Sequence, residues 1–224
     1  MPKVLITGGS DGIGRALCAH YAAQGWQVFA TGRRAEGDIE PPLPSGCEYI
    51  RHDATGDPSE LLNALPETLD AAILNAGAGK VGRPEEHTGK EIQQMIALNT
   101  VAPLLLAQAL LPRLRGGTLA FIGSTAARGA HGDFSVYAAT KAALDGAARA
   151  LALEWDGRVN VLMIHPGPTA TGMHDKAGLG DIAARRYFTS PAIVARSIAA
   201  SVARGRNARM GPLFTLRHAF GGRP

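Results

Sequence analysis

The stretch Thr7-Gly8-Gly9-Ser10-Asp11-Gly12-Ile13-Gly14 decides the fold, because it joins an apolar strand pattern, Lys3–Thr7, to a helical one, Gly12–Gln24. Glycines allow a sharp turn and a close approach of the backbone to a pyrophosphate, and the helix start favours the anion. The sequence therefore predicts a dinucleotide-binding turn, and a tight turn without a ligand is the alternative. The lysine of a P-loop is absent. The expected contacts are Gly8, Ser10, Asp11, Ile13 and Gly14.

Strand and helix patterns alternate along the rest of the chain, which is typical of a parallel sheet wrapped by helices. Further strands are expected over Gln27–Thr31, Glu48–Arg51, Ala71–Asn75, Thr118–Gly123, Asn160–His165 and, less regularly, Phe214–Leu216. Further helices are expected over Glu91–Leu114, Ser135–Glu154 and Pro191–Arg204. The fold class is thus α/β: a single-domain, Rossmann-type, doubly wound parallel sheet of about seven strands with helices on both faces.

One connection departs from that pattern. Three prolines, Pro41, Pro42 and Pro44, lie between the second and third strands and oppose a regular helix. We predict that this crossover helix is missing or vestigial.

Composition narrows the class of protein. With 224 residues, 46% hydrophobic and 19% charged, the chain (1–224) fits one globular domain. No signal peptide and no apolar run of membrane-spanning length are evident, and Cys18 and Cys47 occur in unrelated contexts, so we expect a cytoplasmic protein without cysteine chemistry. The net charge is +4, but the arginines are scattered along the chain, which indicates a solvated basic face. We therefore expect neither a nucleic-acid nor a membrane partner.

Tyr137 and Lys141 are one helical turn apart and share a helix face. A nearby ammonium is expected to lower the pKa of a tyrosine from its usual value and make it a usable acid or base. Chance alone supplies many such pairs, but Ser124 follows the fifth strand at the ligand-binding edge and adds a second hydroxyl for a carbonyl oxygen. A loop hydroxyl bonded to local backbone is the alternative for Ser124.

These motifs together resemble the short-chain dehydrogenase/reductase family over nearly the whole chain. The resemblance rests on the glycine turn, Asn75-Ala76-Gly77, Asn99, Ser124, Tyr137-Ala-Ala-Thr-Lys141, and Pro166-Gly167 with Thr171. It implies that Ser124, Tyr137 and Lys141 carry catalysis, that Tyr137 and Lys141 also contact the cofactor, and that Asn99 supports a proton relay. A satisfied polar group in a buried helix is the alternative for Asn99.

The same resemblance implies further cofactor contacts. Asp53 matches the acidic residue near the adenine, although an exposed turn aspartate would look similar. Asn75, Ala76 and Gly77 are expected to support the sheet beside the cofactor. The residues expected to line the nicotinamide side are Pro166, Gly167, Thr169 and Thr171.

The end of the second strand indicates which dinucleotide binds. A carboxylate there would bind the ribose and repel a 2′-phosphate, but the chain has Arg33 and Arg34 instead. We therefore expect NADP(H) rather than NAD(H). The expected function is hydride transfer between a nicotinamide and a carbonyl or secondary alcohol, with Tyr137 as general acid or base.

Two other classes stay open. A catalytically silent dinucleotide sensor or structural protein shares this fold. Sugar-nucleotide epimerases and dehydratases share the tyrosine and lysine, but the stretch after Pro166 leaves little room for their substrate domain.

Segment 168–190 is expected to form a substrate lid. A homodimer or homotetramer is expected through the helices Glu91–Leu114 and Ser135–Glu154. No metal site is expected, because the spacing of His131, His165 and His174 makes no ligand set, and these histidines are assigned to loops or the lid.

Overall fold

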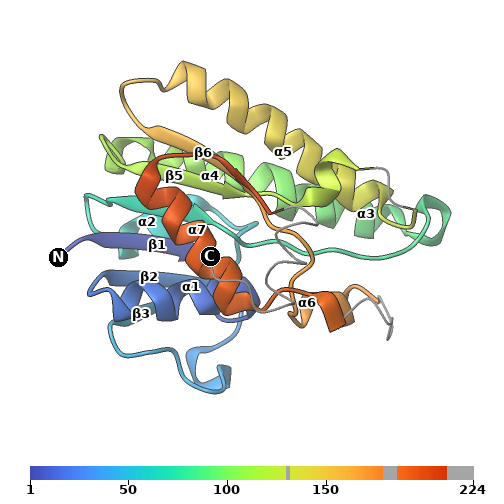
Figure 1. The fold of residues 1–224 in the computed structure, drawn as a ribbon, viewed down its shortest axis with the longest axis horizontal. Helices are drawn as coiled ribbons and strands as arrows, with labels where there is room; N and C mark the ends of the chain where they lie inside the picture. The colour runs from blue at the N-terminus through green and yellow to red at the C-terminus, as the bar shows by residue number, and fades with distance from the viewer. Residues whose placement is uncertain (130–131, 179–185, 211–224) are drawn as a thin grey trace.

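A computed structural model describes residues 1–129, 132–178 and 186–210. Its centre is one sheet of seven parallel strands in the order β3-β2-β1-β4-β5-β6-β7 (Figure 1). The strands are β1 (Lys3–Thr7), β2 (Gln27–Gly32), β3 (Cys47–Arg51), β4 (Ala71–Leu74), β5 (Thr118–Ile122), β6 (Asn160–His165) and β7 (Ala208–Arg209). The winding direction reverses between β1 and β4, so a ligand site is expected at the carboxyl ends of these two strands.

Helices connect the strands. They are α1 (Gly12–Ala23), α2 (Pro58–Ala64), α3 (Gly89–Ile96), α4 (Ala102–Leu110), α5 (Ser135–Glu154), α6 (Met173–Lys176) and α7 (Pro191–Arg204). The doubly wound α/β fold expected from the sequence is confirmed.

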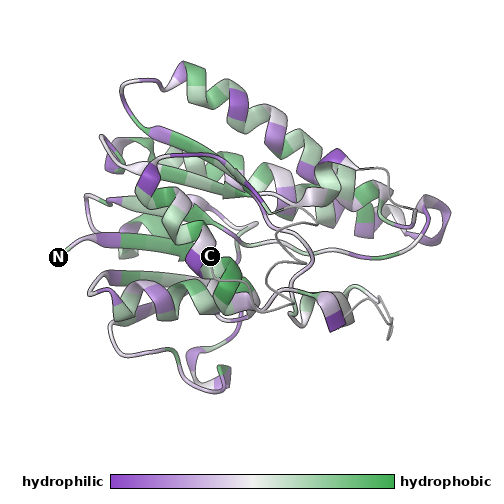
Figure 2. Cartoon of the chain, viewed as in Figure 1, coloured by the Kyte–Doolittle hydropathy of each residue, from purple (hydrophilic) through white to green (hydrophobic). Residues whose placement is uncertain are grey.

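The sheet is buried on both faces, and alternate residues of each strand enter different cores. Val4 and Ile6 of β1 pack with α1 and α7 on one face, whereas Leu5 packs with α2, α4 and α5 on the other. Figure 2 shows hydrophobic residues concentrated in the strands between these layers. Because both cores are continuous across the sheet, its carboxyl edge is a rigid platform for side chains that follow the strands.

The connection from β2 to β3 contains only one turn of 3-10 helix, Glu36–Asp38, before the prolines. The expectation of a vestigial crossover helix is confirmed. Helix α2 was not expected from the sequence: it has seven residues, of which only Leu61 is buried, so it carries almost no apolar periodicity. The seventh strand is Ala208–Arg209, which pairs with Ile164 and His165, while the expected strand Phe214–Leu216 lies outside the described residues.

The expected helix Glu91–Leu114 begins two residues earlier and is interrupted by a π-helical turn, Ala97–Val101, between α3 and α4. The continuous segment Gly89–Arg113 is long and apolar enough to cross a membrane, with 39% of its apolar window buried. A buried core helix of a globular protein can have the same length and apolar composition. Here Leu106 and Leu110 of the segment are buried in the core with α2 and α5.

Candidate active site

The glycine turn lies at the carboxyl end of β1, where α1 begins at Gly12. Gly8 has a left-handed φ of +67°, and a Cβ at Gly14 would lie 2.1 Å from the Gly8 carbonyl oxygen, so neither position accepts a side chain. The Asp11 carboxylate caps the helix by accepting from the Gly12 N–H at 2.7 Å. The turn therefore brings backbone and the N-terminal dipole of α1 to the ligand edge.

Asn75, Ala76 and Gly77 form the floor beside this turn. The Thr7 hydroxyl accepts from the N–H groups of Asn75 and Ala76 at 2.9 and 3.0 Å, and the Asn75 amide donates to the Thr7 carbonyl at 3.0 Å. These bonds tie the ends of β1 and β4 together. A Cβ at Gly77 would lie 3.0 Å from Asn99 Oδ1 and 3.3 Å from Lys141 Nζ, so the floor extends directly to the catalytic candidates.

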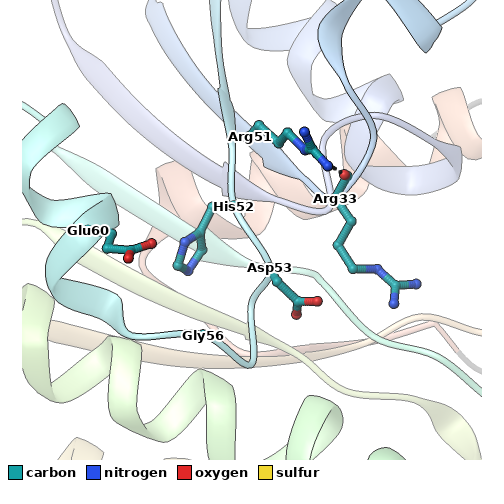
Figure 3. A pocket seen from close by; sticks show the side chains of 6 residues that line it. All are labelled: Arg33, Arg51, His52, Asp53, Gly56 and Glu60. Atoms are coloured by element: carbon teal, nitrogen blue, oxygen red, sulfur yellow. Dashed lines mark hydrogen bonds between the residues drawn. The ribbon is translucent and has the colours of Figure 1, made fainter.

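A pocket of about 380 Å³ opens beside the ends of β2 and β3 (Figure 3). The lining residues are Arg33, Arg51, His52, Asp53, Gly56 and Glu60. Asp53 accepts from the Thr55 N–H at 2.9 Å, and this bond helps to hold the pKa of its carboxyl below the usual value. Asp53 and Arg33 thus line the same pocket, as their expected roles beside the adenine and at the adenosine phosphate require.

The two arginines after β2 differ in their surroundings. Arg34 donates to the Ser10 carbonyl at 2.6 Å, so its guanidinium braces the glycine turn. Arg33 lines the pocket, and Arg51 donates from Nε to the Arg33 carbonyl at 3.2 Å. Of the pair expected from the sequence, Arg33 is therefore the one that faces the space for a phosphate, and Arg51 is an additional basic residue there.

Ser124, Tyr137 and Lys141 meet at the carboxyl end of β5. Ser124 follows the strand and caps a 3-10 turn, Thr125–Arg128, by accepting from Ala126 N at 3.2 Å. Its side chain also hydrogen-bonds to Tyr137, whose ring lies against Gly79. Lys141 donates from Nζ to the Ile122 carbonyl at 3.0 Å. Two hydroxyls and one ammonium are thus gathered at the end of β5, with the ammonium beside Gly77 and the Tyr137 ring beside Gly79.

Burial dominates the electrostatics of this group. Only 8% of Tyr137 and 4% of Lys141 is exposed. Burial raises the pKa of the Tyr137 hydroxyl above its usual value, although the hydrogen bond with Ser124 works against that rise. Burial also lowers the pKa of the Lys141 ammonium from 10.5 to about 8. The sequence-based expectation of a lowered tyrosine pKa is therefore wrong, because desolvation outweighs the other influences on the phenol.

Asn99 lies in the π-helical turn and is fully buried. Its amide accepts from the Ala78 N–H at 3.0 Å and donates to the Ala78 carbonyl at 2.8 Å and to the Thr140 hydroxyl at 3.1 Å. The side chain therefore fixes the segment after β4 to the helix that carries Tyr137. Its expected part in a proton relay stays a prediction.

The segment after β6 crosses the glycine turn. Pro166 accepts from the Thr125 N–H at 3.0 Å, and the Thr169 hydroxyl donates to the Gly167 carbonyl at 2.9 Å. A Cβ at Gly12 would lie 3.0 Å from Thr171 Cγ2, which places Thr171 over the start of α1. The expected nicotinamide-side residues are therefore close to both Ser124 and the turn. Residues 179–185 of the expected lid lie outside the described residues.

His165 does not lie where the sequence predicted it. His165 belongs neither to a loop nor to the lid: it is the buried last residue of β6, bonded to Asp145 and to the Ser124 carbonyl. A histidine at the end of an apolar strand was the available signal. His131 and the side chain of His174 lie outside the described residues. Among the described residues, no cluster of His, Cys, Asp or Glu fits a metal ion.

Comparison with known proteins gives a consistent result. The family model for short chain dehydrogenase matches residues 2–182. An Escherichia coli (strain K12) protein, the uncharacterized oxidoreductase YciK, is 32% identical over 196 residues, which are 78% of this chain and 76% of that protein. The closed form of a serine dehydrogenase complexed with NADP+ has a TM-score of 0.83 at 26% identity and covers 94% of this chain and 95% of its own. A short-chain dehydrogenase from Sphingobium yanoikuyae in complex with NADPH has a TM-score of 0.81 at 25% identity, with coverages of 97% and 91%. The chain belongs to the short-chain dehydrogenase family of oxidoreductases.

Proposed function

We propose that this protein is an NADP(H)-dependent oxidoreductase that interconverts a carbonyl compound and a secondary alcohol. The observation that supports the proposal is the group of Ser124 with the buried Tyr137 and Lys141, which lies beside Gly77 and Gly79 at the sheet edge where the glycine turn begins. The residues present fit the cofactor: the turn at the start of α1, where Gly8 and Gly14 leave no room for a side chain, suits a pyrophosphate, and the pocket beside Arg33 suits an adenosine phosphate.

Each residue has a separate task in this proposal. A bound nicotinamide supplies or accepts the hydride. Ser124 and Tyr137 both direct hydroxyls at the substrate oxygen, and Tyr137 donates or takes up the proton at its phenolic oxygen. Lys141, when protonated, stabilises the phenolate that remains after Tyr137 gives up its proton. Exclusion of water by the buried site strengthens these interactions.

A panel of ketones, aldehydes and alcohols with each cofactor, followed by absorbance at 340 nm, tests the proposal. Turnover with NADP(H) supports it. Binding of NADPH without turnover of any substrate would favour the alternative of a catalytically silent dinucleotide sensor.

Replacing Arg33 tests the preference for NADP(H). Arg33→Ala is expected to weaken NADPH binding about 10- to 100-fold, because hydrogen bonds to charged groups contribute roughly 1.5–3 kcal/mol. NADH binding should change less than threefold, since NADH has no 2′-phosphate. Fluorescence titration with both cofactors measures the difference.

Arg115→Ala is the matched control, because Arg115 is exposed and lies before β5, at the opposite edge of the sheet. It should affect neither cofactor. Equal losses of NADPH and NADH affinity in Arg33→Ala would remove the phosphate-binding role.

We also propose that the outer face of the helix Gly89–Arg113 packs against a second copy of the chain. Ile96, Val101 and Leu105 are 43%, 45% and 47% exposed on this helix, an apolar row that water does not favour. Charged and amide side chains at Lys90 and Gln108 make it less suited to a bilayer.

Size-exclusion chromatography with light scattering is expected to give a dimer or tetramer. Leu105→Glu should shift the protein toward the monomer, because it would bury a carboxylate in an apolar interface. Ala203→Glu, at an exposed position on α7, is the control. A wild-type monomer at micromolar concentration would contradict the proposal.

A further inference from the structure

A cluster behind Ser124 has no part in the chemistry described above; two of its members are buried, and the third, Arg128, is 46% exposed. It consists of Arg128, Asp145 and His165, which come from the 3-10 turn after Ser124, from α5 and from the end of β6 (the Asp145 cluster). We propose that Asp145 and His165 are positioning residues that hold Ser124 in place for hydrogen bonding to Tyr137 and the substrate. The inference rests on the proposed function of Ser124.

His165 connects the cluster to the backbone of Ser124. Its Nδ1 lies 3.0 Å from the Ser124 carbonyl oxygen, and its Nε2 lies 2.9 Å from Asp145 Oδ1. A carbonyl and a carboxylate both accept, so both bonds form together when each ring nitrogen carries a proton. The side chains of His165 and Asp145 are only 5% and 10% exposed, so water replaces these bonds poorly.

The imidazole also packs tightly against the backbone. A Cβ at Gly123 would lie 2.7 Å from His165 Nδ1, so the strand end and the ring are in close contact. The Gly123 N–H donates to Ile164 at 2.8 Å, and the Thr125 N–H donates to Pro166 at 3.0 Å. Ser124 is therefore held on both sides by β6 and its continuation, with His165 at the centre.

Asp145 holds the far end of the same segment. Arg128, the last residue of the turn that Ser124 caps, donates to both Asp145 oxygens at 3.2 Å. Burial alone would raise the pKa of the Asp145 carboxyl, but hydrogen bonds from Arg128 and His165 outweigh it and keep the pKa below its usual value. An ionised Asp145 therefore anchors both ends of the segment that begins at Ser124.

Asp145 lies on α5, the helix that also carries Tyr137 and Lys141. Tyr137, Lys141 and Asp145 follow one another at intervals of four residues, on one face of the helix. The carboxylate that fixes Ser124 therefore belongs to the same rigid element as the tyrosine with which Ser124 must align. Misplacement of a reacting group by about 1 Å can cost about 10²-fold in rate, so a fixed spacing between the two hydroxyls is valuable.

Two substitutions of His165 separate positioning from packing. In His165→Asn the amide nitrogen approximates Nδ1 and keeps a donor for the Ser124 carbonyl. In His165→Gln it approximates Nε2 and keeps the bond to Asp145 instead. We expect kcat to fall less than fivefold in His165→Asn and about 10- to 100-fold in His165→Gln, with unchanged NADPH affinity. The reverse order would show that the bond from His165 to the Ser124 carbonyl does not position Ser124, and would overturn the proposal.

A Ser124→Ala background gives the second test. There the two His165 variants should have the same kcat within twofold, because the hydroxyl that His165 positions is absent. A loss that persists in this background would contradict the proposal, as would a His165→Gln protein that no longer binds NADPH. Arg149→Ala is the control, since Arg149 is exposed and contacts Asp145 at 3.4 Å without touching the Ser124 segment.

Hydrogen exchange keeps the test independent of turnover. The amides of residues 124–128 should exchange at least tenfold faster in His165→Gln than in His165→Asn. Equal exchange would overturn the positioning role even if the wild type is active. A wild type that turns over no substrate would instead count against the proposed function, and the exchange rates would still decide whether His165 holds the segment.

Discussion

Tyr137→Phe is expected to lower kcat by about 10²- to 10⁴-fold, because it removes the only group in the proposed mechanism that exchanges a proton with the substrate oxygen. The ring itself remains, packed against Gly79. The dissociation constant for NADPH should therefore stay within a few-fold of the wild-type value. Steady-state kinetics at 340 nm and a fluorescence titration measure the two effects separately.

Tyr21→Phe is the matched control for this experiment. Tyr21 is a buried tyrosine of α1, and among the described residues its hydroxyl has no hydrogen-bond partner. Removal of that hydroxyl should leave kcat unchanged and should not destabilise the fold. Near-normal turnover in Tyr137→Phe would contradict its assigned role.

Lys141→Met should abolish turnover and at the same time stabilise the fold. The buried ammonium has its pKa lowered to about 8, so folding at neutral pH holds a charge in a site that disfavours it. A pKa lowered from 10.5 to about 8, at about 1.4 kcal/mol per pKa unit, sets an upper limit of roughly 3.5 kcal/mol on the increase in the free energy of unfolding at pH 7 when the charge is removed. Denaturant unfolding of both proteins measures the change.

The gain in stability expected for Lys141→Met depends on pH in a defined direction. The unfolded chain binds more protons at Lys141 than the folded one between about pH 8 and 10.5, so wild-type stability from this group rises with pH across that window. Below about pH 8 the full cost of the buried charge is present. The stability difference between Lys141→Met and wild type should therefore be largest below pH 8 and shrink toward pH 10.5. A variant less stable than wild type at pH 7 would contradict this account.

The fold could be predicted from the sequence because the patterns that indicate its strands, helices and first turn involve residues close together in the chain. Apolar runs such as Ala71–Leu74 are buried on both faces, and the glycine turn joins a strand to a helix without intervening residues. Tyr137 and Lys141 were predictable for the same reason, since helical spacing alone puts them on one face. The prolines after β2 likewise predicted correctly that the crossover helix between β2 and β3 is vestigial.

Most of the features that the sequence did not predict depend on contacts between residues far apart in the chain. Nothing near His165 in sequence indicates its bond to Asp145, and the raised pKa of Tyr137 depends on burial by several elements. Cys18 and Cys47 seemed unrelated, yet the fold places the Cys47 thiol 3.8 Å from the Cys18 carbonyl. The short helix α2 had only its Asp57 cap and Pro58 as signals.

The most direct test of the central claim is the oxidation of NADPH, followed at 340 nm, by wild type and Tyr137→Phe with a panel of ketones and aldehydes. We expect turnover of at least one carbonyl compound by the wild type and a loss of about 10²-fold or more in the variant, with NADPH bound by both. Turnover at equal rates by the two proteins would contradict the central claim.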